Sequence, residues 1–127
     1  MTIERRIAGK ARELVSAQEQ KTDAKHEDET SYRSLCESLP NLLRTAGLAQ
    51  TTAFLKAKSE DHKKVYEHLD MQIRELGLLN ATETLLSKST DSGLTTAQYR
   101  ILLEMTMMVA FWHKRMAQAL LRKSGEK

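Results

Sequence analysis

The sequence predicts an all-α protein, folded as a single compact bundle of about five to seven helices with a long, central C-terminal helix. Its 127 residues contain five glycines and one proline, too few for a turn-rich β fold. Aromatic residues make up only 5% of the chain, whereas Leu, Ala, Glu, Lys, Gln and Met are abundant and favour helix. No repeat or linker divides the sequence, so we expect one helical domain over residues 1–127.

The first half of the chain predicts two helices and a break. Thr2 is positioned to cap a first helix with a narrow apolar stripe, which suits the edge of a bundle. Apolar side chains then recur at spacings of three and four over residues 32–46. Pro40 falls inside this pattern, so we expect it to bend or restart the helix, with Ser38 as the new cap. Gly47 should end the segment or turn the chain into the next helix.

The segment after Gly47 has its own pattern. Ala49, Ala53 and Ala57 recur every fourth residue, which predicts a smooth face that another helix can approach closely, and Phe54 should anchor the segment. Ser59 precedes two acidic residues and predicts the start of a helix that stops at Gly77. Residues 80–83 have the spacing of a capping box before a short helix at 85–86.

The last helix is the best-defined element. Thr95 and Gln98 have capping-box spacing, and a helical pattern continues to about Arg122, roughly 40 Å at 1.5 Å per residue. Two apolar stripes make its middle apolar nearly all round: Tyr99, Leu102, Thr106, Val109, Ala110, His113, Ala117 and Leu120 form one, and Ile101, Met105, Met108 and Trp112 the other. We therefore expect this helix to be central and enclosed by the others.

Few residues are arranged for chemistry, and we expect no catalytic residue, metal site or cofactor. His62 and His68 do not share a helix face, and the HEDE run at 26–29 lacks the spacing of a zinc helix. Cys36 lies in an apolar stripe and predicts a small buried side chain in a reducing cytoplasm. The most apolar run, 101–112, is too short to span a bilayer, and the charged N-terminus does not resemble a signal peptide. We expect a cytoplasmic protein without a membrane partner.

The net charge is only +3, but it is unevenly placed: both ends of the chain are basic, and residues 23–29 contain an acidic patch. Lys56 and Lys58 are about 200° apart on a helix, so they cannot both point into one groove. Lys114 and Arg115 are adjacent, and their long stems can reach past the apolar stripe. Such residues can follow a phosphate backbone without reading bases. On charge alone, ordinary solvated helix faces are the simpler interpretation.

Two segments together resemble a known family. LPNLLRTAGLAQTTAFLKAK (39–58) and YRILLEMTMMVAFWHKRMAQAL (99–120) are similar to the small α-helical subunit of the type III-B CRISPR (Cmr) complex. The matching positions outside the basic residues are Gly47, Leu48, Ala49, Gln50, Ala53, Phe54, Leu55, Tyr99, Arg100, Trp112 and Ala117. The second segment departs from the family in being methionine-rich, with Leu103, Met105 and Met116 at unexpected positions.

The resemblance implies a non-catalytic subunit. Family members stack as a short inner filament beside the backbone subunits, so the implied partners are other Cmr subunits, copies of the chain itself, and the CRISPR RNA with its target RNA. Cleavage of the target belongs to a different, metal-dependent subunit. Lys56, Lys58, Lys114 and Arg115 match the basic positions and are the expected RNA contacts.

Two other interpretations stay open. One is a helical adaptor that binds only protein, through the alanine face or the methionine-rich helix. The other is an enzyme, which needs a cluster of reactive groups that the sequence does not display.

Overall fold

The computed structural model describes residues 2–21 and 26–121, without the side chains of 19–21 and 26–30. Five helices lie in this part of the chain, and no strand: α1 (Ile3–Lys21), α2 (His26–Ala57), α3 (Glu60–Glu75), α4 (Leu85–Ser89) and α5 (Thr96–Leu120). The predicted all-α fold with a long C-terminal helix is confirmed. None of the described helices is long and apolar enough to cross a membrane.

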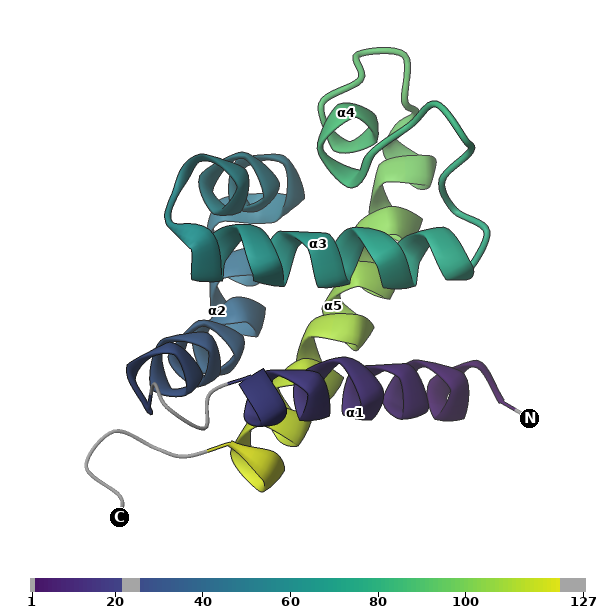
Figure 1. Cartoon of the computed structure of the whole chain (residues 1–127). Coiled ribbons are helices and arrows are strands. Elements are labelled where there is room, and N and C mark those ends of the chain that lie inside the picture. Colours follow the sequence, from purple (N-terminus) through teal and green to yellow (C-terminus); the bar gives the residue numbers. More distant parts are fainter. Residues whose placement is uncertain (1, 22–25, 122–127) are drawn as a thin grey trace.

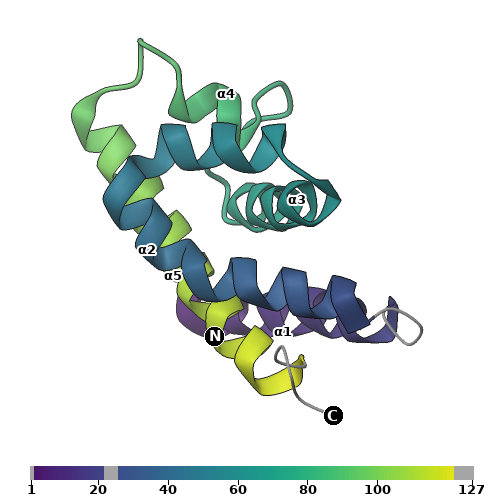
Figure 2. The same ribbon diagram turned by 90° about the vertical axis from the view of Figure 1, so that its left-hand side faces the viewer.

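Helix α5 is the central element of the fold and packs against α1, α2 and α3. The N-terminal part of α2 lies beside α1, whereas its C-terminal part lies beside α3 and α4 (Figures 1 and 2). The α2 ribbon changes direction along its length, which allows one helix to join both groups (Figure 2). The two ends of α5 therefore have different neighbours.

Gly47 is where α2 breaks. Its φ of 83° and ψ of 169° lie in a region that essentially only glycine adopts. The chain restarts as helix at Leu48, and the Tyr99 hydroxyl accepts hydrogen bonds from the backbone N–H groups of Leu48 (3.0 Å) and Ala49 (3.3 Å). A helix start leaves such N–H groups without intrahelical acceptors, so Tyr99 acts as a cap supplied by another helix. Gly47 thus turns the chain into a new helical segment, one of the two alternatives expected for it.

Pro40 does not restart the helix. It lies inside α2, where Gly47 is the residue with non-helical backbone angles. Ser38 is not a cap, because its hydroxyl donates back to the Leu35 carbonyl. The restart expected at Pro40 is therefore wrong, whereas the turn expected at Gly47 is present.

Gly77 ends α3 as predicted. Its φ is 81°, and the N–H groups of Gly77 and Leu78 donate to the carbonyls of Arg74 and Ile73. This is the Schellman arrangement, in which two carbonyls at the helix end find partners.

The starts of α4 and α5 are capped by threonines. Thr95 and Gln98 form the predicted capping box of α5. For α4 the cap is Thr84 with Ser87, and the expected box at 80–83 is wrong. Asn80 and Glu83 do bond to each other, but they form a turn ahead of the helix.

The core draws on every helix. Its largest fully buried side chains include Ile7 of α1, Leu39 and Leu43 of α2, Leu69 of α3 and Leu85 of α4. Helix α5 contributes one face: Leu102, Thr106, Val109, Ala110, His113 and Ala117 are buried.

The opposite face of α5 is open, so the expectation that the other helices enclose it is wrong. Ile101 is 52% exposed and Phe111 is 39% exposed, while Met107, Met108 and Trp112 are half-buried. The helix is central to the fold, yet apolar side chains on this face meet solvent.

The alanine face is also open in this chain. After Gly47, the buried residues of α2 are Leu48, Thr51, Thr52 and Leu55. Ala53 and Ala57 are exposed, and Phe54 is 38% exposed, so its expected anchoring role is wrong. Leu55, one position further on, takes the inward place instead.

Candidate functional site

A buried polar cluster, which we call the histidine cluster, joins four helices. Its members are Tyr32, His68, Gln72 and His113, all nearly inaccessible to solvent. The Tyr32 hydroxyl lies 2.6 Å from Nδ1 of His68 and 3.5 Å from Nδ1 of His113. Nε2 of His113 is hydrogen-bonded to Oε1 of Gln72, whose amide nitrogen donates to the Ile7 carbonyl of α1.

The pattern of donors in this cluster places a proton on Nε2 of His113. The Gln72 amide uses its nitrogen on Ile7, so its oxygen accepts and Nε2 of His113 carries the proton. Nδ1 of His113 faces the Tyr32 hydroxyl. Burial, and then the nearby His68, lower the pKa of His113 to about 3. The ring is therefore neutral at physiological pH and serves to join helices.

Cys36 is fully buried beside Tyr32, as predicted from its apolar surroundings. Burial raises the pKa of its thiol to about 12, although a hydrogen bond with Tyr32 acts in the opposite direction. The thiol is therefore protonated at neutral pH and is shielded from reagents.

Among the residues that the structure describes, no group of three or more histidine, cysteine or acidic side chains could hold a metal ion. His62 and His68 are apart, as their spacing requires: His68 belongs to the histidine cluster, whereas Nδ1 of His62 is hydrogen-bonded to the Ser59 hydroxyl.

Lys56 lies exposed in the last turn of α2, and Lys58 lies exposed just after this helix ends. The Lys56 ammonium sits 5.1 Å from the centre of the Tyr66 ring of α3. The Lys58 ammonium sits 5.3 Å from the centre of the Phe54 ring, and the edge of that ring also contacts His62. Each lysine thus rests on an aromatic face, an attraction worth about 0.5–1 kcal/mol at an exposed site.

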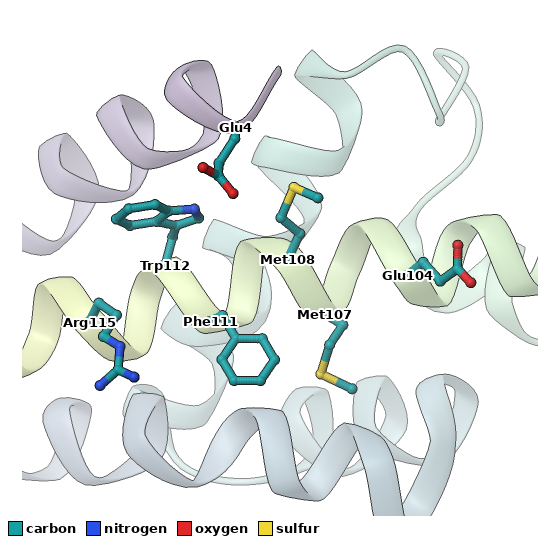
Figure 3. Close-up of a pocket in the computed structure, with 7 residues that line it drawn as sticks. All are labelled: Glu4, Glu104, Met107, Met108, Phe111, Trp112 and Arg115. Carbon is teal, nitrogen blue, oxygen red and sulfur yellow. The ribbon is translucent and has the colours of Figure 1, made fainter. Parts of the chain in front are cut away.

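Lys114 and Arg115 lie in the C-terminal half of α5. Arg115 is exposed and donates to the Gln118 side chain one turn on, and Lys114 is half-buried. Arg115 also borders an open hollow of about 500 Å³ on the uncovered face of α5. The hollow is lined by Glu4 of α1 and by six residues of α5: Glu104, Met107, Met108, Phe111, Trp112 and Arg115 (Figure 3).

The structure does not bring the four predicted cations together. Tyr99, near the start of α5, touches the α2 segment that leads to Lys56 and Lys58. Arg115 lies sixteen residues further along α5, about 24 Å at 1.5 Å per residue. The exposed Lys56 and Lys58 therefore form one pair, and the half-buried Lys114 forms another with the exposed Arg115. Within the described residues, none of the four forms an ion pair with a carboxylate.

Residues 3–120 match the family model described as CRISPR-associated protein (Cas_Cmr5). The chain belongs to the Cmr5 family. Membership makes it a small subunit of the Cmr complex, which associates with other Cmr subunits, and confirms the resemblance found in its two segments.

A solved structure supports the same assignment. The chain is 30% identical to a CRISPR-associated Cmr5 family protein from Thermus thermophilus, with a TM-score of 0.77 over 96% of this chain and all of that one. A search of curated proteins gave no significant match.

The two family segments of this Cmr5 chain meet in the fold. Gly47, Leu48 and Ala49 of the first segment lie against Tyr99 of the second, through the hydroxyl that caps the restarted helix. The sequence contained one indication of this contact, because both segments resemble the same family. The number of residues between them did not predict that they touch. The histidine cluster was also missed; the position of His113 within a buried stripe was its one sequence signal.

Proposed function

We propose that this Cmr5 chain is a non-catalytic, structural subunit of a cytoplasmic type III-B CRISPR ribonucleoprotein. It stacks with copies of itself beside the backbone subunits and helps to hold the duplex of CRISPR RNA and target RNA. Family membership carries the structural part of the proposal. The two cation pairs support the RNA part, because within the described residues none of the four side chains is held in an ion pair with a carboxylate, which leaves them able to contact phosphates.

The separation of the two pairs suits a long ligand. A-form RNA presents its phosphates in a regular array, and proteins recognise it mostly by shape and by backbone contacts. One pair where α2 meets α3 and another near the C-terminal end of α5 would contact the RNA backbone at two separate points, which fixes the direction of the RNA across the subunit. Each contact alone is weak, as expected for one subunit among several.

RNA binding by the purified protein tests the cation pairs. We expect weak binding to a labelled RNA duplex at low salt, with similar affinity for unrelated sequences. The variant Lys56→Glu/Arg115→Glu removes one cation from each pair and introduces repulsion of phosphates. Fluorescence anisotropy across a salt series should show lower affinity and a log–log salt slope shallower by about 1 for each phosphate that the variant no longer binds.

A matched control separates these residues from net charge. Arg12→Glu/Arg44→Glu changes two other exposed cations, and because each reversal lowers the charge by two, both double variants fall from +3 to −1. We expect the control to lose less affinity than Lys56→Glu/Arg115→Glu. Equal losses in the two variants would remove the assigned role of Lys56 and Arg115.

A protein-only adaptor is the second candidate, because Ala53, Phe54 and Ala57 are exposed on one segment of α2. Small side chains beside an aromatic one suit contact with a partner helix. This candidate predicts stable association with Cmr subunits but no RNA binding at low salt. The absence of RNA binding distinguishes it from the first proposal.

A further inference from the structure

The uncovered face of α5 carries a line of five residues, the outer seam: Ile101, Glu104, Met108, Phe111 and Arg115. Their spacings alternate between three and four, which is the pattern of a seam along which two helices pack. Three are apolar, with Ile101 and Phe111 well exposed. Met107 and Trp112 lie on either side of the outer seam. Both are among the α5 residues that, together with Glu4 of α1, border the hollow (Figure 3).

Four residues of the outer seam, Glu104, Met108, Phe111 and Arg115, are arranged symmetrically about a point between Met108 and Phe111, and Ile101 extends the seam beyond them at one end. A twofold axis midway between Met108 and Phe111 places each of these residues opposite the other in a second, antiparallel copy of α5. The same axis places Met107 opposite Trp112. It also places Glu104 of one copy opposite Arg115 of the other, and the reverse pair follows by symmetry.

The charges at the two ends fit this pairing. Glu104 and Arg115 are eleven residues apart, about three turns, and differ by about 20° around the helix, so they share one face. Within the described residues, neither forms an ion pair inside its own chain. An antiparallel pair forms two Glu–Arg contacts, whereas a parallel pair in register places like charges opposite each other.

We propose that two copies of the free protein pair through the outer seam, antiparallel and about a twofold axis. The occupant of the open face is thus a second copy of this chain, held by apolar contact at the centre and by two ion pairs at the ends. Such a contact closes at two copies, whereas a filament needs a head-to-tail contact. The proposal therefore goes beyond RNA binding and filament stacking: it concerns the free protein, in which Arg115, also a proposed RNA contact, has no RNA to bind.

Sedimentation equilibrium over a range of protein concentrations measures the pairing. The average mass should rise with concentration towards twice the 14.5 kDa of one chain and no further. Glu104→Arg and Arg115→Glu each place like charges opposite each other twice, so each should weaken the dimer at least tenfold. The exchange Glu104→Arg/Arg115→Glu restores opposite charges and should return the dissociation constant to within about threefold of the original protein.

The control is Lys63→Glu, which changes an exposed residue of α3 away from the outer seam and should leave the dimer unchanged. Circular dichroism confirms that each variant is folded, as expected for exposed positions. A monomer at every concentration, or oligomers larger than two, would overturn the proposal. So would a dimer that ignores both single changes, or a double exchange that fails to restore it.

Discussion

At the scale of single residues, two polar side chains decide how the helices of this Cmr5 chain are joined. The Tyr99 hydroxyl caps the helix that restarts after Gly47, and it comes from a segment fifty residues away. His113 extends the same principle to the core, where its ring connects α5 to α3 through Gln72. In both cases the side chain forms a hydrogen bond with a polar group of another helix. Without this bond that group would be buried with no partner, which would destabilise the fold.

Replacement of Gly47 by alanine should destabilise the protein by about 1–3 kcal/mol, because its backbone angles are costly for any residue with a Cβ atom. Space is not the reason: an added Cβ would lie 3.6 Å from the Tyr99 hydroxyl oxygen, an ordinary contact. Urea unfolding measures the change. Gly9→Ala is the matched control, since Gly9 lies inside α1 with nothing within 4 Å of an added Cβ.

The two glycines should respond with opposite signs. Alanine at position 9 should stabilise the protein by about 0.5–1 kcal/mol, because glycine is a poor helix former. A Gly47→Ala variant with an unchanged free energy of unfolding would contradict the assignment, because it would show that the backbone angles at position 47 do not require glycine.

The lowered pKa of His113 predicts that the free energy of unfolding falls in mild acid. Its pKa is lowered to about 3 in the folded state, against 6.5 for an ordinary histidine, so the unfolded chain binds the proton more tightly. Above pH 6.5 the ring is neutral in both states and contributes no pH dependence. As the pH falls from 6.5 towards 3, stability falls by up to about 1.4 kcal/mol per unit.

The variant His113→Gln isolates this effect, because an amide can still donate to Gln72 but does not titrate. Between pH 6.5 and 5 the original protein should lose about 2 kcal/mol more of its unfolding free energy than the variant. Denaturant unfolding at several pH values provides the comparison. A difference between the two proteins that stays constant with pH would contradict the assignment.

At the scale of elements, the connection between α3 and α4 is held by a small set of side chains. Asp70 accepts a hydrogen bond from the Leu85 N–H at 2.7 Å and forms an ion pair with Arg74 at 3.0 Å. Arg74 in turn donates to the carbonyls of Asn80 and Glu83. The loop between the helices is therefore fastened to the last turns of α3.

Asp70→Ala should destabilise the protein by about 1–3 kcal/mol, since it leaves the Leu85 N–H without its acceptor and Arg74 without its carboxylate. Hydrogen exchange followed by NMR measures the local effect. The Leu85 amide should exchange faster, while amides in the middle of α5 change only as far as global stability does. Unchanged exchange at Leu85 would show that Asp70 does not hold the loop.

The elements themselves were largely predictable from the sequence, because their signals are local. Gly77 and the Thr95–Gln98 box each act within a few residues of their position, and α3 ends and α5 begins where they predict. Helix α3 also begins after Ser59 as predicted, but the Ser59 side chain makes no capping hydrogen bond and is bonded to Nδ1 of His62 instead. Which apolar face turns inward was not predictable at Phe54 and Leu55, since both are apolar and adjacent. The choice depends on the neighbouring helices, which brought Leu55 into the core and left Phe54 partly exposed.

The candidate site was predictable only in part, for the same reason. The sequence identified Lys56, Lys58, Lys114 and Arg115 as basic positions of the family, and their RNA contacts stay a prediction. Their arrangement as two separate pairs depends on the turn at Gly47 and on the length of α5, which act over the whole fold. The helical geometry used to separate Lys56 from Lys58 does not apply, because α2 ends at Ala57 and Lys58 follows it.

At the scale of the whole molecule, α5 connects two groups of helices and leaves surfaces for partners (Figure 2). Its inner face is part of the core, its outer seam is open, and one cation pair lies near its C-terminal end. The other pair lies where α2 meets α3. A subunit with several separate contact surfaces suits an assembly in which it touches RNA and protein at once.

The most direct test of RNA contact uses the assembled complex. The tagged protein is purified from its native host, cross-linked with ultraviolet light and analysed by mass spectrometry for peptides linked to RNA. We expect co-purification with other Cmr subunits and CRISPR RNA, and cross-links within residues 54–66 and 112–118, where aromatic side chains lie beside the proposed cations. An RNA-containing complex whose cross-links fall only on other subunits would contradict the account.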